Sequence, residues 1–328
     1  MQAAIIERYG LPGVLQFRDV EKPTPGDRDI LIRNNAVTVT SGDCRIRAMN
    51  MPPGFKLIAR LMFGWSKPRQ SILGTELAGV VEATGKDVTN FSVGDEVFAS
   101  CDPDFGAYAE YKCLPAERAA IKPANLSFGE AAALTFGGVT ALHFFRLGNL
   151  QPGERLLING ASGGVGTAAI QVAKHMGAEV TAVCSTSNLE LVRSLGADET
   201  IDYTQTDFTE SDQTYDLILD AAGAAPFSRC RRCLNPGGRF LMILGSFPQL
   251  LRAPWDTLTT DKKVIGGGAK PAPGDLQRLA DMAAAGQLSP HIDRTYPWAQ
   301  LVEAHRYVDQ GRKRGNVVVQ FDCSPAAG

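Results

Sequence analysis

The chain lacks any apolar segment long enough to cross a membrane, because no stretch approaches the roughly 20 unbroken apolar residues that a bilayer requires. Residues 1–10 carry neither the basic start nor the long apolar run of a signal peptide. A formal net charge of −2 over 328 residues gives no electrostatic reason to expect nucleic acid or an anionic membrane as partner. We therefore expect a cytoplasmic globular protein with no nucleic-acid or membrane partner.

The cysteines form no disulfide framework, because they are odd in number and scattered along the chain. Cys230 and Cys233 have C-x-x-C spacing, yet no second such pair or nearby histidine pair completes four zinc ligands. We expect a helix over residues 226–234, in which positions three apart share a face, and favour packing over a redox or metal role. The seven cysteines are Cys44, Cys101, Cys113, Cys184, Cys230, Cys233 and Cys323.

The chain is longer than one hydrophobic core usually supports, so we expect two domains. The pattern of apolar residues also changes along the chain. Residues 1–125 alternate short apolar runs with Pro and Gly turns, which favours a β-barrel or folded sheet. Residues 126–265 alternate apolar strands with helices, which indicates an α/β class with a doubly wound parallel sheet. Beyond them we expect helices over 274–286 and 298–310 and a last strand over 316–321.

The most informative motif is the strand, glycine-rich turn and helix of residues 155–174. Gly160 ends an apolar strand, and Gly163 and Gly166 follow at three-residue spacing before the helix. Such a turn brings backbone N–H groups close to a pyrophosphate and points a helix N-terminus at its charge. In this context the spacing predicts a dinucleotide site. The residues expected to contact the cofactor here are Gly160, Ala161, Ser162, Gly163, Gly164, Val165 and Gly166.

Residues 51–71 form an apolar and basic segment with prolines near both ends. One interpretation is a helical insertion or mobile lid whose apolar side chains border a substrate pocket. The other is a loop packed on the barrel, and the residues alone do not separate the two. The side chains concerned are Phe55, Leu57, Ile58, Leu61, Met62 and Phe63.

Eight motifs occur in a fixed order: residues 74–81, 93–97, 130–134, 139–142, 160–166, 196–203, 215–220 and 234–239. Together they resemble the medium-chain dehydrogenase/reductase family, in its zinc-free quinone oxidoreductase (zeta-crystallin-like) branch. The resemblance implies a GroES-like β-barrel domain of residues 1–125 that residues 266–328 complete. It also implies a Rossmann domain of residues 126–265, a cleft between the two domains, and a homodimer or a tetramer.

Threonines stand where zinc enzymes of this family place two metal ligands. Thr40 takes the place of the barrel cysteine and Thr75 that of the histidine in Gly-His-Glu, and a hydroxyl is a poor zinc ligand beside thiolate or imidazole. Cys44 falls four residues late, so we expect it to point elsewhere. The lobe that carries structural zinc is missing, and the four histidines stand singly, as surface or packing residues. We therefore predict no zinc.

The second strand of the expected Rossmann domain ends without the acidic residue that NAD enzymes use for the ribose 2′-OH. Hydroxyl and amide groups stand there instead, which favours NADPH while NADH stays open. By resemblance, Ser185, Asn188 and Tyr203 surround the 2′-phosphate. Asn188 stands where many relatives place Lys or Arg, which weakens the preference. The same run is also a good helix N-cap, and the two roles are compatible.

A bound cofactor would carry the difficult step, because the chain shows no Ser-His-Asp set and no paired acids. We expect hydride transfer from NADPH to a small-molecule quinone or to the β-carbon of an α,β-unsaturated carbonyl. Thr40 and Thr140 are candidate donors towards the substrate oxygen. By family analogy Gly245 and Ser246 lie near the nicotinamide, although a simple turn explains them equally well.

Two other functions stay open. An alcohol dehydrogenase or carbonyl reductase of the same superfamily would work without zinc or with a metal held weakly through Cys44. A non-catalytic NADPH-binding protein would keep the glycine-rich turn without turnover. Enoyl-thioester reductase relatives carry a tyrosine proton donor that residues 44–50 lack, which argues against that reaction. Asp43 we interpret as a turn aspartate.

Overall fold

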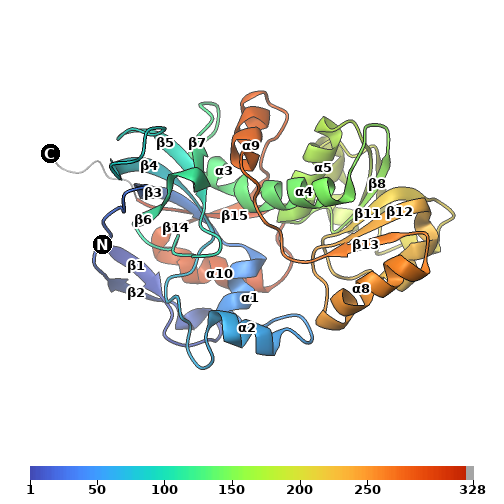
Figure 1. Ribbon diagram of the computed structural model, residues 1–328, viewed down its shortest axis with the longest axis horizontal. Helices are drawn as coiled ribbons and strands as arrows, with labels where there is room; N and C mark the ends of the chain where they lie inside the picture. The colour runs from blue at the N-terminus through green and yellow to red at the C-terminus, as the bar shows by residue number, and fades with distance from the viewer. Residues whose placement is uncertain (323–328) are drawn as a thin grey trace.

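The computed structural model describes residues 1–322, whose strands form a six-stranded sheet, a seven-stranded sheet and a small antiparallel pair (Figure 1). All pairings in the six-stranded sheet are parallel, in the order β10-β9-β8-β11-β12-β13. This arrangement confirms the predicted α/β class with a doubly wound parallel sheet. Its strands are β8 (Arg155–Asn159), β9 (Glu179–Cys184), β10 (Glu199–Asp202), β11 (Tyr215–Asp220), β12 (Leu234–Met242) and β13 (Lys263–Gly266).

Both faces of the parallel sheet are covered by helices. Successive residues of a strand point to opposite faces, so consecutive apolar residues contribute to a core on each side. Leu156 and Leu217 belong to a core cluster with residues of α4 and α5. Leu157 and Ile218, one residue later, belong to a second cluster with residues of α7 and α8. Helices on both faces fix the sheet (Figure 1). They include α4 (Thr135–Gly148), α5 (Gly164–His175), α6 (Leu189–Ser194), α7 (Phe227–Cys230) and α8 (Phe247–Thr259).

The seven-stranded sheet combines strands from early and late parts of the chain around β3. β3 pairs antiparallel with β4, β6 and β15, and β14 pairs parallel with β15. β1 (Gln2–Ile5) and β2 (Gln16–Asp19) form the small pair. The strands are β3 (Asp29–Thr38), β4 (Glu76–Thr84), β5 (Glu96–Ser100), β6 (Tyr111–Pro115), β7 (Ala119–Ile121), β14 (Ile292–Pro297) and β15 (Asn316–Gln320).

Five helices accompany this second sheet. A capping box opens the helix after Ser127, since Ser127 and Glu130 exchange hydrogen bonds. That helix, α3, packs on β3, β4 and β15, although its place in the chain lies within residues 126–265. None of the helices in residues 1–322 is long and apolar enough to span a bilayer. The five are α1 (Ser41–Ala48), α2 (Lys56–Phe63), α3 (Phe128–Ala133), α9 (Asp275–Ala284) and α10 (Leu301–Asp309).

The structure corrects two helices near the end of the parallel sheet. The helix predicted over 226–234 is only α7 plus a 3₁₀ turn, because Leu234 already pairs with Tyr215 as the first residue of β12. Helix α8 was not predicted, since its two prolines suggest a break. Pro248, however, stands in the first turn, where proline is tolerated, and Ser246 and Gln249 form a capping box. Cys230 and Cys233 are both buried, as packing requires, and Cys323 lies outside the described residues.

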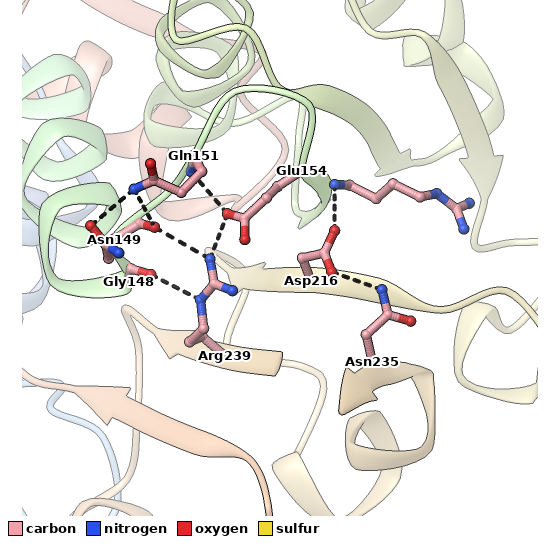
Figure 2. Close-up of polar contacts among 8 residues, drawn as sticks. Gly148, Asn149, Gln151, Glu154, Asp216, Asn235 and Arg239 are labelled. Carbon is pink, nitrogen blue, oxygen red and sulfur yellow. Dashed lines mark hydrogen bonds and ion pairs between the residues drawn. The ribbon is translucent and has the colours of Figure 1, made fainter. Parts of the chain in front are cut away.

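Arg239, from the last of the eight motifs, fastens the sheet to α4 at the end remote from the glycine-rich turn (Figure 2). Its Nε donates to the carbonyl oxygen of Gly148 at 2.9 Å, and its Nη2 donates to Glu154 at 2.5 Å. A guanidinium at this place satisfies a carbonyl that ends the helix and offsets the negative end of its dipole. Nearby, Asp216 accepts from Asn235 and from the backbone of Arg155, which ties β8, β11 and β12 together.

Candidate functional site

Three glycines of the turn after β8 are required for three different reasons. Gly160 has φ +82°, in the left-handed region that side chains disfavour. A Cβ on Gly166 would stand 2.3 Å from the carbonyl oxygen of Gly160, so the start of α5 can approach the strand only with glycine there. A Cβ on Gly163 would meet no atom closer than 3.5 Å. Gly163 therefore leaves open space in front of the turn, which is where a ligand would sit.

The N-terminus of α5 has the donors that a phosphate needs. Gly163 is the N-cap residue of α5 and supplies no side-chain cap. The N–H groups of Gly164, Val165 and Gly166 lie in the first turn, where a helix leaves such donors without an intrahelical acceptor. Strand order reverses between β8 and β11, and ligands bind at the carboxyl ends of strands flanking such a reversal. The turn thus fits a dinucleotide pyrophosphate, as the sequence predicts.

Asn188 holds two serine hydroxyls at the edge of this turn. Its Nδ2 donates to the Oγ atoms of Ser162 and Ser185, each at 3.1 Å. Both hydroxyls accept from the amide, so each keeps its own hydrogen for another acceptor. Asn188 is therefore placed to orient two donors rather than to contact a phosphate with its own amide hydrogens.

Tyr203 and Asp202 lie beside these serines, at the end of β10. The backbone N–H of Tyr203 donates to the carbonyl oxygen of Cys184 at 3.1 Å, and the tyrosine side chain is 60% exposed. Asp202 accepts from the hydroxyls of Thr186 and Thr204, which hold its pKa below the usual range. The sequence pattern does not reveal this carboxylate, because Asp202 ends the third strand of the sheet along the chain rather than the second. Its oxygens accept from its own loop and from the turn after β9.

The candidate donor Thr40 has a structural task that the sequence did not reveal. Its hydroxyl accepts from the backbone N–H of Asp43 and donates to the carboxylate of Asp43 at 2.7 Å. The pair forms the capping box of α1, so Asp43 lies in the first turn of a helix rather than in a loop turn. Donation from Thr40 to a substrate would cost the bond from its hydroxyl to the Asp43 carboxylate, while the two backbone bonds of the cap would remain. The second candidate, Thr140, is only 3% exposed within α4.

The residue after Thr75 is a buried glutamate, whose carboxyl group links the seven-stranded sheet to helix α4. Glu76 of β4 accepts from the hydroxyl of Thr38 and from the backbone N–H of Phe136 in α4. Burial raises the pKa of this carboxyl to about 8, and the hydrogen bonds from Thr38 and Phe136 oppose the rise. The hydroxyls of Thr75 and Thr135 are buried without a hydrogen-bond partner among residues 1–322. This polar cluster could have been suspected from Thr75-Glu76 in the first motif, but its partners come from distant segments.

Cys44 points away from the two threonines, as expected, and towards α10. Its Sγ lies 3.3 Å from Nδ1 of His305, and both residues are buried. Burial raises the pKa of the Cys44 thiol, which keeps it protonated and unsuited to a metal. Within the described part of the chain, no three His, Cys, Asp or Glu residues are grouped to hold a metal ion. Zinc independence itself stays a prediction.

Gly245 and Ser246 follow β12 and are explained by local structure. Ser246 caps α8, and its hydroxyl donates to Gln249 at 2.8 Å. A Cβ on Gly245 would stand 2.8 Å from Met242. Their expected place near a nicotinamide is a prediction that these contacts neither require nor exclude.

An apolar cavity of about 240 Å³ lies between α1, α2 and the loop before β6. Residues 51–71 are in part helical, as one interpretation expects, and α2 contributes Met62 and Phe63 to the cavity. Leu57 and Leu61 are exposed and lie outside the lining, Met62 is exposed at its edge, and Phe55 packs edge-on against Phe247 at 5.5 Å. The lining residues are Ile46, Met62, Phe63, Pro68, Arg69, Gln70, Leu73, Pro103 and Phe105.

Comparison with known proteins gives consistent matches along the chain. Residues 26–124 match the family model described as alcohol dehydrogenase GroES-like domain, and residues 195–319 match the model described as zinc-binding dehydrogenase. The mitochondrial NAD(P)H oxidoreductase RTN4IP1 of Mus musculus is 32% identical over 97% of this chain and 89% of its own length. The 2-methylene-furan-3-one reductase of Solanum lycopersicum is 32% identical over 97% of this chain and 79% of its own length.

Among solved structures, the quinone oxidoreductase from Coxiella burnetii is similar over its whole length. The two structures superpose with a TM-score of 0.86 at 27% identity. The match covers 98% of this chain and 99% of that one.

Proposed function

We propose a function for this chain on the basis that it belongs to the medium-chain dehydrogenase/reductase family, in its quinone oxidoreductase branch. The protein transfers hydride from NADPH to quinones or α,β-unsaturated carbonyls. The observation that carries the proposal is the open turn at Gly163, in front of a helix N-terminus without a side-chain cap. NADPH, when bound, supplies the hydride. The chain's own residues bind the cofactor, orient it and shield the acceptor.

The preference for NADPH rests on the hydroxyls beside the turn. Ser162 and Ser185 accept from Asn188, so each can donate its own hydrogen to a 2′-phosphate, with the hydroxyl of Ser187 lying 3.4 Å from that of Ser185. The ionised Asp202 would oppose a second anion, but it is held by the hydroxyls of Thr186 and Thr204. We propose that these two effects leave a net preference for NADPH, weaker than a basic residue at Asn188 would give.

The cavity beside α1 supports a small, largely apolar acceptor. α1 begins at Ser41, directly after Thr40, and its Ile46 lines the cavity. Phe63 and Phe105 pack edge-on at 5.9 Å and form an aromatic wall. A largely apolar lining of this kind would limit water around the reacting carbon. We propose that the acceptor enters here and that zinc takes no part, because Thr40 and Thr75 offer only hydroxyls.

The test is oxidation of NADPH, and in parallel NADH, by protein treated with a chelator and then freed of it. The acceptors are quinones, enones or alkenals, and simple aldehydes. Turnover of quinones or enones with NADPH is the expected result. Activity confined to aldehydes and restored by zinc would overturn the metal-free reductase. NADPH binding without consumption across the panel would favour a binding protein.

A homodimer and a cytoplasmic location are further parts of the proposal. β13 is an edge strand of the parallel sheet, and three large apolar side chains of the neighbouring α8 are exposed, namely Leu251, Trp255 and Leu258. Such an edge with apolar surface beside it favours pairing with a second copy. Light scattering during gel filtration measures the mass, and fractionation of cells that express the protein tests the location.

A further inference from the structure

Helix α2, at the lower edge of the molecule in Figure 1, is apolar towards the interior and also towards solvent. On the inner side Ala59 is buried, and Phe63, one turn later, packs edge-on against Phe105. The rest of the helix surface therefore points away from the protein. Four large apolar side chains stand there and in the turn that follows, each between 58% and 62% exposed. This outer face consists of Leu57, Leu61, Met62 and Trp65.

The charge around the outer face is of one sign. Residues 51–71 contain four basic residues and no aspartate or glutamate, an excess that the net charge of −2 conceals. Within residues 1–322 none of the four pairs with a carboxylate, and Glu7, which borders the same hollow as two of them, pairs with Arg18. The guanidinium of Arg60 lies 5.7 Å above the ring of Trp65. The four are Lys56, Arg60, Lys67 and Arg69.

This combination of groups fits the surface of a bilayer that contains anionic lipid. Leucine and tryptophan side chains enter the boundary between headgroups and acyl chains, while lysine and arginine beside them attract anionic headgroups. Tryptophan is favoured at that depth because its ring is apolar and its N–H is polar. An apolar protein surface would cover the leucines but would give the four basic residues no counter-charge. With eight residues, α2 is far too short to span the bilayer, so the contact is with its surface.

We propose that the outer face of α2 docks the protein on a membrane surface that carries anionic lipid. The expectation of no membrane partner rests on the net charge of the whole chain, and the local charge around α2 overrides it. Met62 belongs both to the outer face and to the lining of the apolar cavity, so docking would bring the edge of the cavity to the bilayer. Acceptors dissolved in the lipid would then reach the cavity directly, a consequence that rests on the proposed function, whereas docking itself does not.

Sedimentation of the full-length protein with lipid vesicles tests the docking. The vesicles contain phosphatidylcholine alone or equal parts of phosphatidylcholine and phosphatidylglycerol. We expect binding to the mixed vesicles at about 0.1 M salt, weaker binding at about 1 M salt, and little binding to phosphatidylcholine alone. The double variants L57S/L61S and K56Q/K67Q should each weaken binding by about tenfold or more. K86Q and V93S are the controls and should bind as wild type does, because both residues are exposed and lie outside residues 51–71.

The fluorescence of Trp65 reports on the contact at a single residue. Mixed vesicles should shift the emission of the wild-type protein to shorter wavelength, because an exposed indole leaves water on docking. W65F should lose this shift. W255F should keep it, although Trp255 on α8 is 65% exposed and would report on docking through that helix instead.

Three results would overturn the proposal. They are failure to prefer the mixed vesicles, a shift that W255F loses and W65F keeps, and a lower mass for L57S/L61S than for wild type in lipid-free gel filtration. The last would show that the outer face covers a second copy of the chain. Because binding is measured without an acceptor, a protein that reduces no quinone can still dock, and one that reduces a water-soluble quinone but binds no vesicle refutes only the docking.

Discussion

Nη1 of Arg47 donates to Nδ1 of His305 across 3.1 Å in the interior of the protein. Nη2 of the same guanidinium pairs with Asp309 at 2.7 Å. A guanidinium has only donors, so Nδ1 is the acceptor and the neutral ring carries its hydrogen on Nε2. The thiol of Cys44 lies against the same nitrogen at 3.3 Å. These contacts join α1 to α10, and burial together with the charge of Arg47 holds the pKa of His305 well below its usual range.

Replacing His305 by Gln should change how stability depends on pH. Because the folded protein does not protonate His305 while the unfolded chain does, wild type loses stability as pH falls below about 6.5. We expect the stability of wild type relative to H305Q to fall by about 1.4 kcal/mol for each pH unit below that value. Urea unfolding at pH 7.5, 6.5 and 5.5 measures this difference. Parallel curves for the two proteins would contradict it.

Glu76→Gln should have the opposite pH signature. The folded pKa of Glu76 is raised to about 8, so the folded protein keeps a proton that the unfolded chain releases near pH 4.5. Wild type therefore loses stability as pH rises from about 4.5 to about 8, and E76Q should gain on it between pH 5.5 and 8.5. Thermal unfolding across this range checks the prediction, with Glu117→Gln as an exposed control. A constant gap between E76Q and wild type would refute the assigned pKa.

Two glycine variants of the turn should separate binding from folding. Gly163→Val places its side chain in open space and should weaken NADPH binding by about 100-fold or more, with little change in melting temperature. Gly166→Ala forces a Cβ against the carbonyl oxygen of Gly160 and should destabilise the fold by about 1–3 kcal/mol. Fluorescence titration and thermal unfolding on both variants test the contrast. Unchanged NADPH affinity in G163V would remove the phosphate site from this turn.

Ser185→Asp should reverse the cofactor preference. A carboxylate beside Ser162 would repel a 2′-phosphate and accept from the ribose hydroxyls of NADH instead. We expect kcat/KM for NADPH to fall by about 100-fold, while that for NADH changes little or rises. Ser185→Ala is the control that removes the hydroxyl without adding charge. An equal loss with both cofactors would show that position 185 does not face the 2′-phosphate.

Met62→Trp should fill the cavity between α1 and α2. Met62 is 62% exposed at its edge, so a larger side chain can be accommodated without rebuilding the core. We expect KM for quinones and enones to rise several-fold while the dissociation constant of NADPH stays unchanged. Leu57→Trp, at an exposed position of the same helix outside the cavity lining, serves as control. Identical kinetics in M62W and L57W would place the acceptor elsewhere.

The sequence predicted the parts of the structure whose causes are local. The turn from Gly160 to Gly166 and the alternating apolar strands follow from backbone sterics and side-chain period, and both are found. The capping boxes of Thr40 and Ser246 could also be recognised through Asp43 and Gln249, but Thr40 was interpreted as a donor to the substrate and Ser246 as a contact of the cofactor. Helix capping and ligand binding use the same residue types, so the sequence alone does not separate the two roles.

What the sequence did not reveal depends on pairing between distant residues. Lys313 meets Gly164 only because β15 joins the seven-stranded sheet beside the turn. Glu76 meets Phe136, and Cys44 meets His305, across separations that no periodicity records. Asp202 reaches the loop of Ser185 through the pairing of β10 with β9. None of these residues stands out in the sequence, and the role of each becomes visible only from its neighbours in the fold.

The pairing of β15 with β3 has a consequence for folding of the chain during its synthesis on the ribosome. Thr38 of β3 is synthesised well before its partner Val318, because the two residues lie far apart along the chain. The parallel sheet, complete once Gly266 has appeared, can form while one edge of β3 still lacks its neighbour. Throughout that interval the nascent chain presents an unpaired strand edge to other polypeptides. Translation that stops before β15 would leave this edge permanently open, and such fragments should be the ones that chaperones retain.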